Sequence, residues 1–187
     1  VLWWSPDPRM TLRPVNLKIS QSLRKTIRAC LDDPSITLRV DHDFPGVMRA
    51  CATTERQGQD GTWITHEIMD AYTALHEQGH AHCITVEQNQ HSIGGRYCVS
   101  FGAMVFGESM FSRVRDSSKL ALAALCAWCY DHGVTFIDCQ QETAHLRSLG
   151  AMPISRPEFL RHVERAVLAP IQGKWAMDKF ILERYLR

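Results

Sequence analysis

Two short stretches of this sequence place polar side chains where an apolar β-strand is expected to end. The first, residues 134–140, reads as a buried strand that delivers Asp138 and Gln140 at its end. The second, residues 106–113, runs from apolar residues into Glu108, two serines and a base. In open α/β sheets, ligands bind in the crevice beyond the carboxyl ends of the strands. A single Asp at a strand end is more commonly a cap or turn residue, so the candidate site depends on both stretches together.

Two other groupings have the residue types of metal sites without the full spacing. Cys126 and Cys129 fall within an apolar helical pattern, have no second cysteine pair, and are not completed by His132. His80 and His82 would share one face of a strand, but no third ligand is in view, so packing and hydrogen bonding explain them better. We therefore expect no metal site. The seven cysteines, an odd number, predict free thiols in a reducing compartment.

The length and charge of the chain set broad limits. The 187 residues suffice for one core with a small appendage, and no apolar run is long enough to span a membrane. The formal net charge is only +1, but residues 1–30 are strongly basic. Their bases are Arg9, Arg13, Lys18, Arg24, Lys25 and Arg28, against the single acid Asp7. This segment is a candidate surface for a polyanion, and a solvated basic face fits its charge equally well.

Hydrophobic periodicity and turn residues predict alternating helices and strands. Helices are expected at residues 20–31, 45–53, 66–78, 119–130, 143–149 and 157–168. Strands are expected at residues 36–41, 80–87, 93–100, 103–108 and 134–138. Residues 1–13, which contain Pro6 and Pro8, are expected to be irregular, and residues 175–187 fit either helix or strand. The order indicates an α/β or α+β fold with a mixed, largely antiparallel central sheet flanked by helices.

Three local features refine these elements. Ser117–Ser118 is expected to cap the helix at 119–130. Gly94–Gly95 predicts a β-bulge or a close approach of another part of the chain to the strand that follows. Trp3–Trp4 needs a surface to cover, either as a strap on the core or as an aromatic wall for a planar ligand.

A series of short motifs follows these elements along the chain. They are Leu2–Arg9, Gly61–Thr65, Ala71–Tyr72, Leu75–His76, Gly79–His82, Gly94–Gly95, Tyr97, Gly107–Arg113, Ser118–Lys119, Ile137–Gln140, His145 and Ser148–Ala151. In this order they resemble the bacterial leucyl/phenylalanyl-tRNA–protein transferase family over nearly the whole chain. No single motif is decisive, and their shared order makes a chance match implausible.

The resemblance implies an acetyltransferase-like (GNAT-type) fold that uses aminoacyl-tRNA as donor and no cofactor. It implies transfer of Leu or Phe, with Met as a further donor, to the N-terminal Arg or Lys of acceptor proteins, which marks them for N-degron proteolysis. A cytoplasmic monomer is expected. Residues 1–35 would be a remnant of the amino-terminal region with a basic first helix, and residues 36–187 the aminoacyl-transfer domain. Because the chain begins with Val1, we expect upstream residues to be missing, and tRNA binding without transfer is one expected outcome.

The resemblance also assigns roles to the site residues. Asp138 and Gln140 would be the catalytic pair, with Asp138 as the electrostatic end and Gln140 in contact with the attacking amine. Glu108 would engage the amino group or terminal adenosine of the donor, and Trp63 would offer the adenine a stacking platform. The substrate-binding set is Trp63, Tyr72, Arg96, Val105, Glu108, Met110, Ser112, Leu125 and Ile137. For its apolar members, ordinary core packing is the alternative.

The sequence departs from the family pattern at two positions. Arg96 stands where the family usually carries an apolar residue beside the donor pocket, and its guanidinium would narrow or repolarise that pocket. Thr143 replaces a usual Asn. The preferred donor therefore stays open. The candidates for binding tRNA phosphates are Arg24, Lys25, Arg28, Arg113 and Lys119, with the carboxyl-terminal bases. Such contacts predict that salt weakens tRNA binding steeply.

Three other functions stay open. A CoA-dependent N-acetyltransferase would need a Gln/Arg-x-x-Gly-x-Gly/Ala loop before a helix, and none precedes Lys119 or Thr143. A catalytically silent tRNA-binding module would share the basic residues. A peptidoglycan-type aminoacyltransferase would share the donor and differ in its acceptor.

Overall fold

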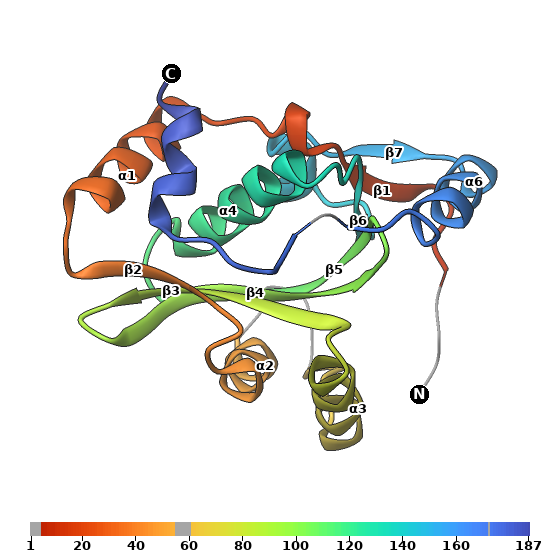
Figure 1. Ribbon diagram of the computed structural model, residues 1–187, viewed down its shortest axis with the longest axis horizontal. Helices are drawn as coiled ribbons and strands as arrows, with labels where there is room; N and C mark the ends of the chain where they lie inside the picture. The colour runs from red at the N-terminus through yellow and green to blue at the C-terminus, as the bar shows by residue number, and fades with distance from the viewer. Residues whose placement is uncertain (1–4, 55–60, 172) are drawn as a thin grey trace.

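The computed structural model describes residues 5–54, 61–171 and 173–187 and is built on one seven-stranded sheet (Figure 1). The strands are β1 (Arg9–Leu12), β2 (Ile36–Val40), β3 (Ala81–Gln88), β4 (His91–Phe101), β5 (Met104–Ser112), β6 (Ile137–Gln140) and β7 (Met152–Ile154). They lie in the order β2-β3-β4-β5-β6-β1-β7. The helices are η1 (Pro14–Asn16), α1 (Gln21–Asp32), α2 (Phe44–Thr53), α3 (His66–Glu77), α4 (Ser117–Asp131), α5 (Ala144–Ser148), α6 (Arg156–Ala166) and η2 (Lys179–Tyr185), of which η1 and η2 are 3-10 helices.

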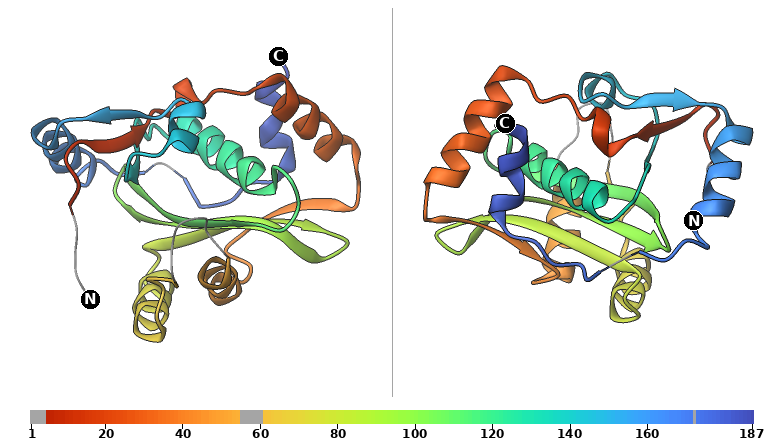
Figure 2. Two further views of the ribbon diagram at one scale, coloured as in Figure 1. Left: turned by 180° about the vertical axis from the view of Figure 1, so that it is seen from behind. Right: turned by 45° about the horizontal axis from the view of Figure 1, so that its top comes forward.

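Helices cover both faces of the sheet. Figure 1 shows α1, α4 and η2 on one face, and α2 and α3 on the other. Figure 2 shows from further directions that η2 packs beside α1 and α4. Every residue from Leu120 to Cys129 of α4 is buried, as expected for a helix that is apolar all round. The expected fold class, a mixed sheet flanked by helices, is confirmed.

One junction in the sheet differs from the rest. The pair β5 and β6 is parallel, whereas the other neighbouring strands described here are antiparallel. The parallel ladder contains only Val105 opposite Ile137 and Phe106 opposite Asp138. We call the end of this ladder, formed by residues 107–112 of β5 and 139–140 of β6, the fork. Backbone groups beyond the ladder have no partner across the junction, so the fork is where the sheet can admit a ligand.

The close approach expected at Gly94–Gly95 is confirmed. A Cβ atom built on Gly94 would lie 2.2 Å from Ser117 Oγ, and one on Gly95 would lie 2.8 Å from the Ile84 carbonyl oxygen. A real Cβ does not fit at such distances. Gly94 therefore allows α4 to begin directly against β4, and Gly95 allows the close approach of the β3 backbone.

The amino-terminal segment differs from the expectation. Residues 9–12 are not irregular but form β1, which lies between β6 and β7 and is antiparallel to both. The prolines at 6 and 8 restrict only the residues before the strand, and its hydrogen-bond partners come from far along the sequence. The expectation for Trp3–Trp4 lies outside the described residues.

Further differences concern the second half of the chain. Of the strand expected at 134–138, only the last two residues are extended, as the start of β6 (Ile137–Gln140). The strand β7 was not expected. The N-cap of α4 is Asp116, in the left-handed region with φ 63°, and not Ser117–Ser118. Ser117 is instead the first helical residue, and its hydroxyl donates to carbonyl oxygens of the preceding segments. The tail forms the 3-10 helix η2, which the sequence left undecided between helix and strand.

Candidate active site

The carboxylate of Asp138 is fully buried and forms a bidentate ion pair with Arg9. The Nε atom of Arg9 donates to Asp138 Oδ1 at 2.9 Å, and its Nη2 atom donates to Oδ2 at 2.6 Å. The pair exists because β1 runs beside β6, with Thr11 opposite Asp138. The Arg9 guanidinium also lies over the Phe159 ring of α6, 5.0 Å from its centroid. A bidentate arginine fixes the orientation of a carboxylate as well as its charge.

Asp138 in turn holds the backbone of Gln140. The Gln140 N–H donates to Asp138 Oδ1 at 2.8 Å. Gln140 has a φ of 62°, in the left-handed region that residues other than glycine seldom adopt. Its side-chain Nε2 donates to Glu108 Oε2 at 3.1 Å, which turns the amide oxygen of Gln140 toward other partners. That oxygen can accept an N–H of a bound amine.

A β-bulge places Glu108 at the fork. In the β4–β5 ladder, Cys98 pairs with Gly107 and Tyr97 pairs with Ser109, so Glu108 is the extra residue. A bulge re-aims the side chain of the inserted residue. The Glu108 carboxyl thereby reaches Gln140 from β6 and forms a hydrogen bond with Tyr72 from α3. Three separate elements meet at this carboxyl.

The surroundings of Glu108 shift its protonation. Burial raises the pKa of Glu108 above its ordinary value, hydrogen bonds from Gln140 and Tyr72 oppose this, and the charge of Asp138 adds to it. Burial also raises the pKa of Tyr72, and the charge and hydrogen bond of Glu108 raise it further, so the phenol stays protonated. A raised pKa brings the carboxyl closer to the pKa of an α-amine. The carboxylate is then a better proton acceptor for that amine.

Arg9 was not predicted from the sequence as a site residue. Arg9 and Asp138 are 129 positions apart, and Arg9 was counted only among the amino-terminal bases. A signal was present, since Arg9 ends the Leu2–Arg9 motif. What the motif alone could not reveal was the pairing of β1 with β6.

The apolar members of the predicted donor pocket do not all lie in one place. Val105, Leu125 and Ile137 are fully buried in the main core, and Met110 is half-buried on β5. Trp63 is 43% exposed and packs edge-on against Tyr72, with ring centroids 6.3 Å apart. Val105, Leu125 and Ile137 thus belong to the core cluster that contains α4, whereas Trp63 packs against Tyr72, a hydrogen-bond partner of Glu108. Their roles toward a substrate stay predictions.

Arg96 lies inside the molecule at the same place. It is 3% exposed and stands opposite Met110 in the β4–β5 ladder. A Cβ atom built on Gly107 would lie 2.8 Å from Arg96 Nη2, 3.2 Å from the Asp138 carbonyl oxygen and 3.6 Å from Ile137 Cγ2. The guanidinium thus rests against the start of the fork, on the face that α4 covers.

The Ser112 hydroxyl serves the turn between β5 and α4. It donates to the Val114 carbonyl oxygen at 2.9 Å and lies 3.0 Å from Ser117 Oγ. Ser112 is nevertheless exposed. Its predicted contact with a substrate would therefore be made by a hydroxyl that already anchors this turn.

The predicted phosphate-binding residues form two neighbouring groups. Arg24, Lys25 and Arg28 lie on α1, whose Thr26 hydroxyl contacts Asp116 Oδ2 at 3.4 Å and so joins α1 to the start of α4. The second group contains Arg113, which donates to the Ser92 carbonyl oxygen, and Lys119, which pairs with Asp116 at 2.7 Å. Arg115, with an 86% exposed side chain, extends this group and was missed by the sequence analysis.

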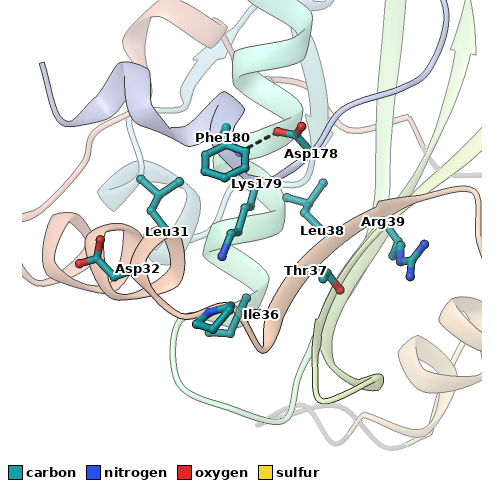
Figure 3. Close-up of a pocket in the computed structure, with 10 residues that line it drawn as sticks. Leu31, Asp32, Ile36, Thr37, Leu38, Arg39, Asp178, Lys179 and Phe180 are labelled. Carbon is teal, nitrogen blue, oxygen red and sulfur yellow. Dashed lines mark hydrogen bonds between the residues drawn. The ribbon is translucent and has the colours of Figure 1, made fainter.

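A hollow of about 510 Å³ lies away from the fork, between α1, β2 and η2 (Figure 3). Its lining includes Leu31, Leu38, Lys179 and Phe180. The ammonium group of Lys179 already donates to two backbone carbonyl oxygens, at 3.1 and 2.6 Å. The ammonium group of Lys179 is therefore used within the fold, and we take the fork as the candidate site.

The cysteine and histidine side chains have the residue types of metal ligands. Within residues 5–54, 61–171 and 173–187, no group of three or more His, Cys, Asp or Glu side chains is arranged to hold a metal ion. Cys126 and Cys129 are buried in α4. His82 forms a 2.7 Å contact with Asp41, and His80 packs against Phe101.

In the described part of the chain, no helix is both long and apolar enough to cross a membrane.

Known proteins resemble this chain in sequence. The family model described as leucyl/phenylalanyl-tRNA protein transferase matches residues 11–164. The leucyl/phenylalanyl-tRNA–protein transferase of Cupriavidus pinatubonensis is 57% identical over 185 residues, which cover 99% of this chain and 74% of the relative. The protein of the same name from Burkholderia multivorans is 55% identical over 182 residues, which cover 97% of this chain and 71% of the relative.

Solved structures resemble it in fold. The crystal structure of FemX matches with a TM-score of 0.53 and 13% sequence identity, over 85% of this chain and 64% of that chain. At this identity, the likeness concerns the fold alone.

Proposed function

The chain belongs to the leucyl/phenylalanyl-tRNA–protein transferase family of aminoacyltransferases, and we propose that it transfers Leu or Phe from tRNA to the amino terminus of acceptor proteins. We further propose that acceptors begin with Arg or Lys, that Met is a third donor, and that transfer marks the acceptor for N-degron proteolysis. We place the reaction in the cytoplasm, where aminoacyl-tRNA is available. One copy of the chain suffices, because every proposed group comes from the same chain.

The reaction is a displacement at an ester. The acceptor's amine nitrogen attacks the carbonyl carbon that joins the amino acid to the terminal ribose. A C–N bond forms, the C–O bond to the ribose oxygen breaks, the amine loses one proton and the ribose oxygen gains one. The α-amine has an ordinary pKa of about 7.7–8.0, so a useful fraction is neutral in the cell. The enzyme needs to orient it and to accept its proton.

Gln140 and Glu108 are proposed to contact the amine. The Nε2 atom of Gln140 is held by Glu108 at 3.1 Å, which leaves the Gln140 amide oxygen to accept an N–H of the amine. Glu108, whose pKa is raised by burial, then takes the proton released as the C–N bond forms. Tyr72 also forms a hydrogen bond with this carboxyl.

Asp138 is proposed to act through Gln140. Both oxygens of Asp138 are bound by Arg9, and one also accepts the backbone N–H of Gln140. Both carboxylate oxygens are thus engaged within the protein. Asp138 therefore serves as a positioning residue, which keeps the electrostatic role that the sequence suggested.

The donor is proposed to lie along the fork. The apolar residues Val105, Met110, Leu125 and Ile137 supply its side-chain pocket, and exposed Trp63 offers a face to the terminal adenine. The bases of α1 and of the β5–α4 turn are available for the phosphates of the acceptor stem. This arrangement needs no nucleotide-binding loop, because the ester is already activated.

The observation that carries the proposal is the contact between Gln140 and Glu108. It places an amide acceptor beside a carboxyl of raised pKa, at the one parallel junction described in the sheet. These are the groups that an amine needs when it attacks an ester.

The test is transfer of labelled leucine from Leu-tRNA to a peptide beginning with Arg, compared with one beginning with Ala. The test variant is Gln140→Ala, and the control is Gln88→Ala. Gln88 is the last residue of β3, and its Nε2 atom also donates to a carboxylate, that of Asp33, at 3.3 Å. Transfer to the Arg peptide that is lost only in Gln140→Ala supports the proposal. Salt-sensitive tRNA binding without transfer would instead identify a silent tRNA-binding module.

A further inference from the structure

The phenol of Tyr72 is held in place next to the proposed proton acceptor. Its hydroxyl donates a hydrogen bond to the Glu108 carboxylate. Its ring packs edge-on against Trp63 and Tyr97, with centroid distances of 6.3 and 5.5 Å. A tyrosine hydroxyl both donates and accepts hydrogen bonds. The ring is therefore fixed, while the hydroxyl is able to exchange a proton with Glu108.

Four side chains of the site contact one another in a row, in the order Trp63, Tyr72, Glu108 and Gln140. Both ends of this row are accessible to a substrate. Trp63 is 43% exposed, and Glu108 and Gln140 are half-buried. Tyr72 keeps 9% of its surface exposed between them.

The proposed substrates give this row a direction. The terminal adenine is proposed to stack on Trp63, and the attacking amine is proposed to contact Gln140. The ribose is bonded directly to the adenine, so its esterified oxygen is expected beside Tyr72, the next residue in the row. The leaving oxygen and the attacking nitrogen then lie on either side of the Glu108 carboxyl. The inference below rests on the proposed function, because that function supplies both substrates.

We propose that Tyr72 is a catalytic acid, which donates its phenolic proton to the ribose oxygen as the C–O bond breaks. Glu108 has by then taken the proton that the amine lost when the C–N bond formed. Protonated Glu108 becomes the donor in its hydrogen bond with Tyr72, which frees the phenolic O–H for the ribose oxygen. As Tyr72 gives up its proton, it receives the proton of Glu108. One proton has then passed from the amine to the ribose, and both residues end as they began.

The surroundings of Tyr72 suit this role. Burial raises the pKa of Tyr72, and the charge and hydrogen bond of Glu108 raise it further, so the phenol holds a proton near neutral pH. The same surroundings disfavour a free phenolate. Loss of the phenolic proton and arrival of the Glu108 proton are therefore expected to occur together. A positioned acid or base of this kind contributes on the order of 10²–10⁴-fold to a rate.

The experiment compares two donors in single-turnover transfer to a peptide beginning with Arg. One is Leu-tRNA, and the other is Leu-tRNA in which sulfur replaces the esterified ribose oxygen. A thiol has an ordinary pKa of about 8.5, far below that of an alcohol, so the sulfur leaves without being protonated. We expect Tyr72→Phe to slow transfer from the oxygen ester on the order of 10²–10⁴-fold and to leave transfer from the thioester nearly unchanged.

Two further variants complete the comparison. Glu108→Gln should slow transfer from both donors, because the amine has to lose its proton in either case. Tyr185→Phe is the matched control, since Tyr185 is a half-buried tyrosine whose hydroxyl donates to the Ala123 carbonyl oxygen at 3.0 Å. It should change neither rate.

A loss in Tyr72→Phe that is confined to the oxygen ester supports the inference. An equal loss with both donors assigns Tyr72 a positioning role and overturns the inference, as does a full rate with both, and each leaves the proposed function intact. If Tyr72→Phe does not fold, 3-fluorotyrosine at this position provides a more acidic phenol of nearly the same shape. A rate changed only for the oxygen ester then supports the inference, and any other result overturns it. Absence of transfer from Leu-tRNA by the unaltered chain overturns the proposed function and this inference with it.

Discussion

Arg9 and Asp138 form a buried bidentate ion pair, with Arg9 Nη2 2.6 Å from Asp138 Oδ2. The pair joins β1 to β6, two strands that the sequence separates by more than a hundred residues. Asp138 also accepts the backbone N–H of Gln140, whose φ of 62° is unusual. Through these contacts, Arg9 helps to fix the position of Gln140, whose side-chain amide is proposed to contact the attacking amine.

Replacing Arg9 with Met should destabilise the fold strongly. Asp138, with a side chain that is 0% exposed, would remain charged and buried without its partner. Breaking one side of a buried pair costs about 3–5 kcal/mol. Unfolding by urea measures the loss. In the control Arg39→Met, the free energy of unfolding should change by about 0–1 kcal/mol, as for an exposed pair. A similar small change in both variants would contradict the structural role given to Arg9.

Replacing Glu108 with Gln should slow transfer without preventing substrate binding. A carboxamide can keep the hydrogen bond from Gln140 but does not accept the amine proton. Loss of a positioned base lowers the rate on the order of 10²–10⁴-fold. Initial rates at saturating donor measure the change in kcat. Glu87→Gln is the control, since Glu87 is a buried acid on β3 whose neighbour is Arg39. A full rate in Glu108→Gln would remove Glu108 from the mechanism.

Glu108 should also make stability depend on pH. Because burial raises its pKa in the folded protein, Glu108 keeps its proton over a range in which the unfolded chain has released it. The folded state then binds more protons than the unfolded state, so the free energy of unfolding falls as pH rises. This loss begins near the ordinary glutamate pKa of about 4.3 and ends above the raised value.

The Glu108→Gln variant should lack this component. We expect the stability of the variant to rise relative to the unaltered chain as pH increases through that window. Urea midpoints measured from pH 4 to pH 8 provide the comparison. Parallel curves for the two proteins would show that folding does not shift the pKa of Glu108.

The basic face of α1 should account for part of the salt dependence of tRNA binding. Each phosphate contact contributes roughly 0.7–0.9 to the slope of log K against log salt concentration. Replacing Arg24, Lys25 and Arg28 with Ala should therefore weaken binding and reduce the slope by roughly 2–3. Titration of labelled tRNA at several salt concentrations measures both quantities. Arg147→Ala is the control, because Arg147 is already paired with Glu142 and is not among the predicted phosphate-binding residues. An unchanged slope in the triple variant would place the tRNA elsewhere.

The sequence determined the elements whose information is local. The helix α1 begins after its N-cap Ser20, and α3 begins after its N-cap Thr65, within one residue of the starts that periodicity and turn residues predicted. The glycines at 94 and 95 predicted a close approach, which Ser117 makes to Gly94 and the Ile84 backbone makes to Gly95. The polar residues at 108, 138 and 140 were identified as a site because of their types and their places after apolar runs. Each of these features depends on residues within a few positions of one another.

The tertiary structure decided what these residues touch. The strand β1 forms because β6 and β7 satisfy its backbone, and neither is near it in the sequence. The bulge that turns Glu108 toward Gln140 exists only in the register between β4 and β5. Arg96 is a buried, unpaired cation only because of what surrounds it among the described residues. Pairing, register and burial arise from contacts between distant segments, and a single sequence carries no direct record of those contacts.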